Sequence, residues 1–439
     1  MNLPVISLFV RRVFGDRTIW VLPVTAFAVS SALTLAVAGG VHFFWTLTGE
    51  LAPAYTVLSS IALALLVLPL TSLAGAAARL LARRRDERLS SLRLIDASTA
   101  TLTGLTVVEA TVLAAGAVAG VLGWAALLPL IGLLPFAGGS IGVSAQWIGV
   151  PGVLAVLAGL TLIAAVSSLV GLRRIAITPL GVRTRQRAQA VHWVRLLVFV
   201  ALVIGGQLMV AAARGSADVG VAVAVVLVAL AVPLLALHLL GPRVLSLGPK
   251  RRLRRARTPE ALVAARTVMD APRQAWQQVG ALSVTTYVGV MAGAGLSLAG
   301  KGEGWITRPE ELFLKQDLRT GVLVTVLISV VLAACSVALN QSAQVVDRAE
   351  LHRGLSYAGM PVSRIHAMRR TSEMLALGIV MIVSVAAAMI TGAPLIGASV
   401  LFAPLSLLVV VTTLVAGVLH VRAGVDLTAP ALRRSVATT

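Results

Sequence analysis

The chain has 439 residues, of which 58% are hydrophobic and only 12% are charged, and its mean hydropathy is +0.94. A soluble domain of this length needs far less apolar surface, so the composition excludes a soluble fold. Apolar runs that are continuous, without strict alternation, also exclude an outer-membrane barrel. The single cysteine, Cys335, excludes an intramolecular disulfide and a cysteine metal site. The sequence therefore predicts an all-α polytopic membrane protein.

Ten apolar runs are long enough to cross a bilayer, which takes about 20 residues of helix. The first run is too long for the core of a signal peptide and has no convincing cleavage site, so we expect it to remain as a span. In chain order, the predicted spans are residues 19–45, 55–80, 105–134, 147–171, 194–213, 218–241, 275–299, 320–343, 373–395 and 399–421.

The net charge of +20 follows the predicted topology. With the N-terminus inside, the cytoplasmic segments hold 32 of the 37 Lys and Arg residues. The five in outer loops are Arg214, Lys301, Arg308, Lys315 and Arg319. This asymmetry is the positive-inside rule and predicts that both termini are cytoplasmic. The charge therefore indicates contact with membrane lipids and no nucleic-acid partner. The Arg-, Ala- and Gly-rich composition is typical of a high-GC bacterium, so we expect a bacterial cytoplasmic (inner) membrane.

Two short charged bridges separate spans in the two halves of the chain. The first covers residues 83–98 and the second covers residues 349–361. The pairs that match at a single offset of 263 are Glu87 with Glu350 and Leu92 with Leu355. A membrane protein that repeats a charged, structured loop offers two similar binding surfaces to a partner in the cytoplasm.

The repeat extends upstream of each half. Short basic amphipathic helices are predicted at 8–14 and 262–269, the second with Thr258 as N-cap and Pro259 at its first position. Such parallel duplication is common in transporters. The predicted domains are a first repeat at 1–171, a linker with spans five and six at 172–257, a second repeat at 258–425 and a cytoplasmic tail at 426–439.

The bridges resemble those of the FtsX-like permeases, the membrane subunits of MacB-type ABC transporters. That family has a basic helix after the second span, a Leu-x-x-Leu-Gly-Ala-Ser-like turn, and then a helix with Glu near its start. The matching segments are 92–98 followed by Glu109, and 355–361 followed by Glu373. The ten-span arrangement, two FtsX-like four-helix repeats joined by two extra helices, is similar to permeases of antimicrobial-peptide resistance. The chain departs from the family in having Asp96 in place of glycine and in lacking a large extracellular domain.

The resemblance implies a separate ABC ATPase, present as two copies, that carries ATP and magnesium and docks on the bridges. The residues it assigns to this coupling contact are Leu92, Arg93, Ile95, Asp96, Leu355, Ser356, Tyr357 and Gly359. The chain itself contains no Gly-x-x-x-x-Gly-Lys-Ser/Thr loop to wrap phosphates, and no His-Glu-x-x-His or Gly-x-Ser-x-Gly motif. We therefore expect a non-catalytic subunit without a cofactor of its own.

The longest outer loop, residues 300–319, carries a capping box from Thr307 to Glu310. It predicts a short helix lying on the outer membrane face, with Trp305 and Phe313 toward lipid. Two interpretations stay open for these aromatic residues. A plain interfacial connector is slightly favoured, and the alternative is a substrate gate at a lateral opening between bundles.

Polar residues inside spans are candidates for function because their burial in lipid is costly. Glu109 and Glu373 lie near the cytoplasmic ends of their spans, so we expect each to pair with nearby arginine. Gln207 is expected to form an interhelical hydrogen bond. Gly116 and Gly120 have the spacing that permits close helix packing.

Three functions remain in view. The first is a permease subunit that exports or extracts a hydrophobic or amphipathic molecule, such as an antibiotic, an antimicrobial peptide or a lipid. The second is a mechanotransmission or signalling subunit that transports nothing. The third is an ion-coupled secondary transporter, a class that usually buries carboxylates or histidines at the midplane, where this chain has almost none.

Overall fold

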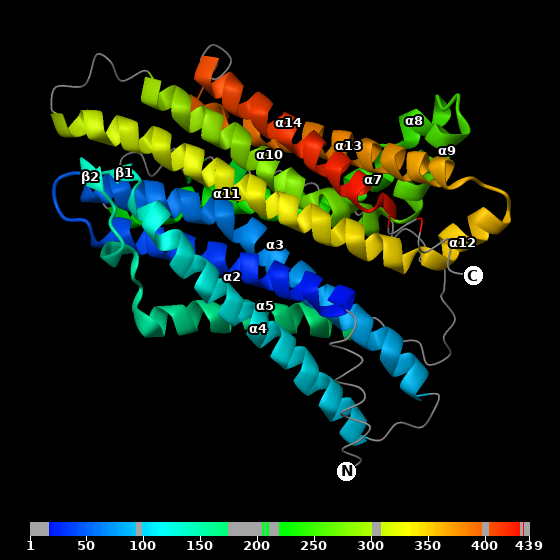
Figure 1. Ribbon diagram of the computed structural model, residues 1–439. Coiled ribbons are helices and arrows are strands. Elements are labelled where there is room, and N and C mark those ends of the chain that lie inside the picture. Colours follow the sequence, from blue (N-terminus) through cyan, green and yellow to red (C-terminus); the bar gives the residue numbers. More distant parts are fainter. Residues whose placement is uncertain are drawn as a thin grey trace. The chain divides into compact units, whose positions relative to one another are not determined.

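The computed structural model describes residues 17–93, 99–173, 204–206, 208–209, 219–300, 309–396, 404–430 and 433. Helices account for nearly all of these residues, together with one small two-stranded sheet (Figure 1). The predicted amphipathic helix at 8–14 and most of the predicted span at 194–213 lie outside the described residues.

Nine of the described helices are long and apolar enough to cross a membrane, and they fall on nine of the ten predicted spans. The chain is therefore an all-α, multi-pass membrane protein. The elements are α2 (Arg17–Thr46), α3 (Ala52–Arg93), α4 (Thr99–Gly132), β1 (Pro135–Phe136), β2 (Gly139–Ser140), η1 (Ser144–Gln146), α5 (Gly149–Arg173), α7 (Val219–Leu247), α8 (Lys250–Arg254), α9 (Pro259–Asp270), α10 (Pro272–Gly300), α11 (Pro309–Asp347), α12 (Ala349–Tyr357), α13 (Val362–Ile396) and α14 (Pro404–Leu427).

The order of long helices is similar in the two halves of the chain. Helices α2, α3, α4 and α5 follow one another as α10, α11, α13 and α14 do. The bridges differ, however. Helix α3 continues unbroken through the first bridge as far as Arg93, whereas the second half is interrupted at Arg348 before α12 begins. A structural repeat of the two halves stays a prediction.

Two compact units divide the chain. Unit 1 comprises Met1–Phe43, Leu70–Leu134 and Ser140–Arg185, and its core joins α2 to α4 through Leu35, Trp124 and Leu128. The predicted close packing at Gly116 and Gly120 is confirmed. A Cβ on Gly116 would lie 3.2 Å from the carbonyl oxygen of Val24, and one on Gly120 would lie 2.8 Å from that of Ala28.

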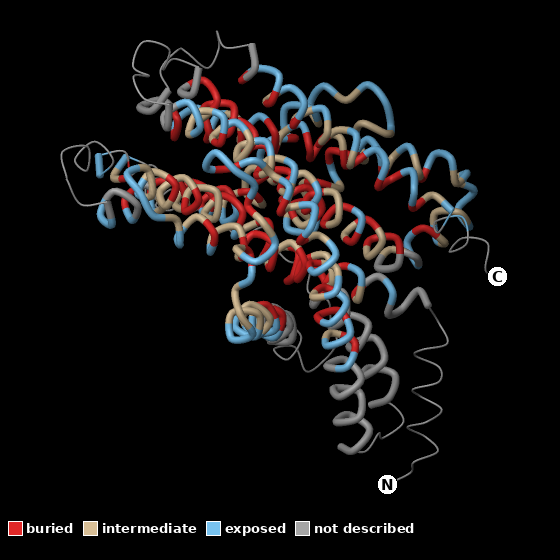
Figure 2. The backbone as a smooth tube through the Cα atoms, turned by 60° about the vertical axis from the view of Figure 1, so that its left-hand side comes forward, coloured by how far each residue is buried: buried red, intermediate tan, exposed pale blue. Residues whose placement is uncertain are grey.

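Unit 2 comprises Phe44–Pro69, Pro135–Gly139 and Gln186–Thr439. Helix α10 lies at its centre and packs against α7, α9, α11, α13 and α14. Burial concentrates along this central helix, while the outward faces of its neighbours are exposed (Figure 2). A second glycine pair, Gly289 and Gly293, lets α14 approach closely, since Cβ atoms there would lie 2.6 Å from Thr413 Oγ1 and 2.9 Å from Ser406 O.

The amphipathic helix predicted before the second half is confirmed as α9. Thr258 is its N-cap, with the side-chain hydroxyl accepting a hydrogen bond from the Ala261 N–H at 3.3 Å, and Pro259 opens the helix. Ala264, Ala265 and Val268 form the buried face.

The predicted short helix on the outer face is wrong. Residues from Pro309 onward form the first turns of α11, which runs for 39 residues to Asp347 without interruption. The segment from Glu310 to Thr320 contains no proline or glycine, so nothing in it ends the helix before the apolar span begins.

Candidate functional site

Helix α12, the second predicted bridge, presents one face inward and one outward. His352 is buried and Leu355 is half-buried against Val345 and Ile365. On the exposed side, Leu351 is 57% exposed and Tyr357 is 73% exposed. His352 and Leu355 are three residues apart and share the inner face, whereas Leu351 and Tyr357 each lie three residues from the exposed Gly354, at the two edges of the outer side. We call this outer side the α12 face and define it by Leu351 and Tyr357.

A glycine turn fixes the end of α12. Gly359 has a positive φ of 84°, its N–H donates to Ser356 O at 2.9 Å, and the Met360 N–H donates to Leu355 O at 3.0 Å. These two bonds are the Schellman arrangement, which requires a left-handed residue at the position of Gly359. Leu355 and Met360 pack together against the same small core. The turn thus holds α12 at a fixed angle to α13.

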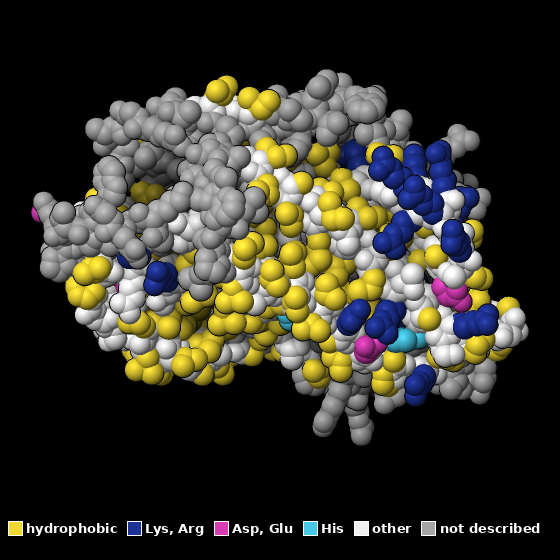
Figure 3. All heavy atoms as spheres, turned by 90° about the horizontal axis from the view of Figure 1, so that it is seen from above, with side chains coloured by type: hydrophobic (Ala, Val, Ile, Leu, Met, Phe, Trp, Pro, Cys, Tyr) yellow, Lys and Arg dark blue, Asp and Glu magenta, His cyan; other side chains and the backbone are white. Residues whose placement is uncertain are grey.

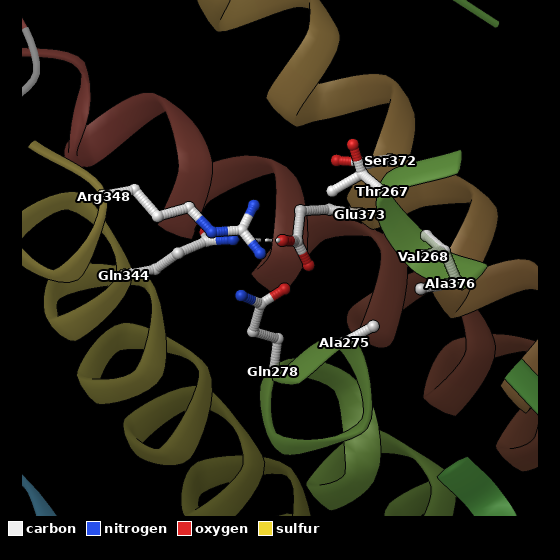
Figure 4. Close-up of a pocket in the computed structure, with 9 residues that line it drawn as sticks. All are labelled: Thr267, Val268, Ala275, Gln278, Gln344, Arg348, Ser372, Glu373 and Ala376. Carbon is white, nitrogen blue, oxygen red and sulfur yellow. Dashed lines mark hydrogen bonds between the residues drawn. The ribbon is translucent and has the colours of Figure 1, made fainter. Parts of the chain in front are cut away.

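Directly behind α12 lies a buried polar network centred on Glu373 of α13, which is 2% exposed (Figure 4). Gln344 of α11 donates from Nε2 to Glu373 Oε1 at 3.4 Å. Gln278 of α10, with its amide oriented to satisfy its neighbours, donates to both carboxylate oxygens, to Oε2 at 2.9 Å. Two glutamines from different helices thus supply the hydrogen bonds that a buried carboxylate needs.

Two arginines complete the network. Arg369 of α13 is 6% exposed and donates from Nη2 to Gln341 Oε1 at 3.2 Å and to Thr428 Oγ1 at 3.3 Å. Arg348, at the junction of α11 and α12, donates to Gln274 Oε1 of α10 at 3.0 Å. Both guanidinium groups lie near enough to act electrostatically on Glu373. The sequence predicted that Glu373 pairs with arginine, whereas its hydrogen bonds come from glutamine side chains. The network therefore links α10, α11, α13 and residues at the end of α14.

His352 of α12 lies near the two arginines of this network. Burial, together with the positive charges of Arg369 and Arg348, lowers the pKa of His352 from 6.5 to about 4. A proton on this imidazole would place a third cation beside two arginines. His352 is therefore neutral at physiological pH, and its ring is buried on the inner side of α12.

The cavity among these side chains is small. It holds about 10 Å³, roughly the space of one water molecule, and is lined by Thr267, Val268, Ala275, Gln278, Gln344, Arg348, Ser372, Glu373 and Ala376. Pockets that bind small organic molecules are usually about 300–1,000 Å³. The network is thus a junction between helices, and a cargo molecule does not fit inside it. Among the described residues, no three His, Cys, Asp or Glu side chains gather as a metal site.

The other predicted site residues are distributed as follows. Leu92 and Arg93 belong to the last turn of α3, but their side chains, like that of Glu109 in α4, lie outside the described part. Ile95, Asp96, Gln207 and Trp305 are also outside it. In the second bridge, Ser356 is half-buried and Gly359 is exposed. Leu351 was not among the predicted coupling residues, although it is exposed near the start of α12.

A second polar cluster lies near the start of α11. Asp317 is 5% exposed, and its Oδ2 accepts a hydrogen bond from the Tyr55 hydroxyl at 2.5 Å and from the Ala137 N–H at 2.7 Å. Ala137 and Gly138, both with positive φ, form the turn between β1 and β2. Nothing in the sequence pattern pointed to this hairpin, because two-residue strands leave no alternation to detect.

Aromatic rings surround this second cluster. Phe44 stacks on Tyr55 with ring centroids 5.8 Å apart, and its ring meets the edge of Phe136 at 5.1 Å. Phe313, the predicted gate residue, is 47% exposed, and its ring lies 3.6 Å from the position of a Cβ on Gly138. Phe313 thus covers the hairpin turn.

Charge is strongly asymmetric within unit 2. On the face in Figure 3, Lys and Arg side chains gather at the end where α8, α9 and α12 lie, and a broad hydrophobic surface covers the adjoining helices. At the other end of α11, Lys315 and Arg319 are the basic side chains among the described residues. The α12 face and the Glu373 network belong to the basic end.

These features define the class of protein: a multi-pass helical membrane protein with an exposed helix braced by a buried polar network. Comparisons with protein-family models, curated proteins and solved structures gave no match.

Proposed function

We propose that this chain is the membrane permease subunit of an ABC transporter of the FtsX-like type, driven by ATPase subunits on separate chains. The observation that supports this most strongly is α12, a short helix between two spans whose inner face is buried beside the Glu373 network while its outer side is exposed. A helix in this position would transmit a movement of the cytoplasmic ATPase to α10, α11, α13 and α14 together.

The charge distribution supports a cytoplasmic location for α12, because basic residues are retained on the inner side of a bacterial membrane. An ATPase in the cytoplasm would then contact the α12 face, where the apolar side chains of Leu351 and Tyr357 are exposed beside charged residues. The sequence has no phosphate-binding loop of its own, which is consistent with ATP hydrolysis by a subunit on another chain.

The proposed cargo is a hydrophobic or amphipathic molecule taken from the bilayer. The cavity behind α12 is far too small for such a cargo, so a lateral route along the outward helix surfaces is favoured. At the opposite end, the proposed gate includes Phe313 and, outside the described part, Trp305. Asp317 and Tyr55 close this end by hydrogen bonding to each other and to the hairpin.

Copurification tests the proposal. The tagged full chain, extracted from its own cells in mild detergent, should carry a nucleotide-hydrolysing subunit at about two copies per chain. The variant Tyr357→Asp should lose that subunit. Leu427→Asp, at an exposed residue of the same end of unit 2, should retain it. Purification of the chain without any ATPase, under conditions that preserve its fold, would contradict the proposal.

A further inference from the structure

The turn that connects α7 to α9 carries a dense group of cations. Lys250, Arg251, Arg252, Arg254, Arg255 and Arg257 are all exposed. We call these six residues the α8 cluster. None of the six forms an ion pair within the described residues. Six cations within eight positions repel one another, so such a surface is stable only where anions gather around it.

Apolar side chains flank the α8 cluster on both sides. Leu247 at the end of α7 and Leu262 in α9 are each 48% exposed. Helix α8 packs on α9, and α9 buries Ala264, Ala265 and Val268 against unit 2, which leaves Leu262 on its free face. Exposed leucines beside exposed arginines are typical of an element that lies in the membrane interface.

The position of the α8 cluster along the chain indicates how deep it lies in the membrane. The stretch that qualifies as a membrane span runs from Leu227 to Arg254, so the first four cations of the cluster lie at its very end, directly after α7 stops at Leu247. At this depth the nearest anions are lipid phosphates, and groups of four to eight basic residues beside a span attract anionic lipid. Five of the six cations are arginines, whose planar guanidinium groups bind phosphate oxygens in pairs.

We propose that the α8 cluster is a binding site for the headgroups of anionic phospholipids, with Leu247 and Leu262 in contact with the acyl chains. The site is separate from the α12 face and does not depend on the transport function. It takes up lipids with a net negative headgroup, such as phosphatidylglycerol, in preference to zwitterionic lipids.

Native mass spectrometry of the purified full chain in detergent tests the proposal by titration with phosphatidylglycerol and with phosphatidylcholine. Wild-type protein should bind phosphatidylglycerol more tightly. The triple variant Arg251→Gln, Arg254→Gln and Arg255→Gln removes three of the six cations and should weaken that binding at least tenfold, since each cation near an anionic surface contributes about fivefold.

A matched variant removes the same charge elsewhere. Arg364→Gln, Arg370→Gln and Arg422→Gln neutralise three exposed arginines of unit 2 and should leave phosphatidylglycerol binding within about twofold of wild type. Equal losses in the two triple variants would show that net charge alone attracts lipid, and would overturn the site. Both variants should elute as wild type does on size exclusion, which verifies folding.

Two further experiments distinguish a lipid headgroup from a soluble phosphate as the bound anion. Excess inorganic phosphate should not displace phosphatidylglycerol, and Leu262→Gln should weaken lipid binding. Displacement by phosphate, with no effect of Leu262→Gln, would identify a soluble anion site and overturn the proposal. Unchanged lipid binding in the α8 triple variant, together with loss of a copurifying protein, would overturn it in favour of a protein-docking surface.

Discussion

The carboxylate of Glu373 is the most constrained side chain of the site. It is 2% exposed, accepts hydrogen bonds from Gln278 and Gln344, and lies in the field of Arg369 and Arg348. Removal of one member of a buried charge network leaves the other charge uncompensated, which costs far more than removal of both.

We predict that Glu373→Ala lowers the free energy of unfolding by about 3–5 kcal/mol, because Arg369 is then buried beside Arg348 without a carboxylate. Thermal unfolding of the purified protein in detergent measures this loss. The double variant Glu373→Leu with Arg369→Met should recover most of the stability, since both charges are gone. A double variant as unstable as Glu373→Ala would mean that the network contributes through packing alone.

A pH effect follows from His352. Its pKa is about 4 in the folded protein and 6.5 in the unfolded chain, so the unfolded chain binds more protons between those values. Stability should therefore decrease as the pH falls from about 6.5 toward 4. Over about pH 7 to 5, the unfolding temperature of wild type should fall more steeply than that of His352→Gln. Parallel curves for the two proteins would contradict a buried neutral histidine.

At the residue scale the sequence predicted part of this site. Glu373 stood out because an acid inside an apolar run is rare, and Arg369 and Arg348 lie near enough to act on it electrostatically. Gln278 and Gln344 did not stand out, since an uncharged amide in a span has many structural uses. Leu351 was missed because the resemblance concentrates on the turn after it.

At the scale of elements, glycine positions control how closely helices approach. Gly120 of α4 faces α2, where a methyl group would meet Ser31 and the Ala28 carbonyl, whereas nothing lies within 4 Å of the same position on Gly159 of α5. We predict that Gly120→Ala destabilises by about 1–3 kcal/mol through overpacking. Gly159→Ala should be neutral or slightly stabilising, because alanine favours helix. Thermal unfolding of both variants gives the comparison, and equal shifts would refute the packing argument.

The hairpin of β1 and β2 depends on Asp317. Tyr55→Phe removes one hydrogen bond but keeps the stack on Phe44, and should cost about 1 kcal/mol. Asp317→Ala leaves both the Tyr55 hydroxyl and the Ala137 N–H without their acceptor, so the hairpin should open more often. Hydrogen exchange at residues 135–140 should increase clearly in Asp317→Ala and only slightly in Tyr55→Phe. Unchanged exchange in Asp317→Ala would show that the aromatic contacts alone hold the hairpin.

Element prediction succeeded where a local rule applied. Apolar length gave nine described spans, and the Thr258–Pro259 pair gave the start of α9. The second bridge, predicted as a structured segment, is helix α12. The separate outer helix failed because a capping box marks where a helix begins and says nothing about where it ends. The hairpin and the Asp317 contacts join residues far apart in sequence, which no local pattern encodes.

At the scale of the whole molecule, unit 2 places an exposed helix, a buried polar network and a central helix in series. Arg348, the residue before α12, donates a hydrogen bond to Gln274 of α10, and the Gly359 turn connects α12 to α13. In the proposed function, the α12 face contacts the ATPase, the network transmits the movement and the outward helix surfaces contact the cargo.

The most direct test of this assignment is ATP hydrolysis by the reconstituted complex in lipid nanodiscs. Leu351→Asp with Tyr357→Asp should reduce permease-stimulated hydrolysis at least tenfold, because two charged groups are placed in an apolar contact. The control Leu427→Asp should keep the wild-type rate. If the double variant is inserted and folded but stimulates hydrolysis as wild type does, the ATPase does not contact the membrane subunit at α12.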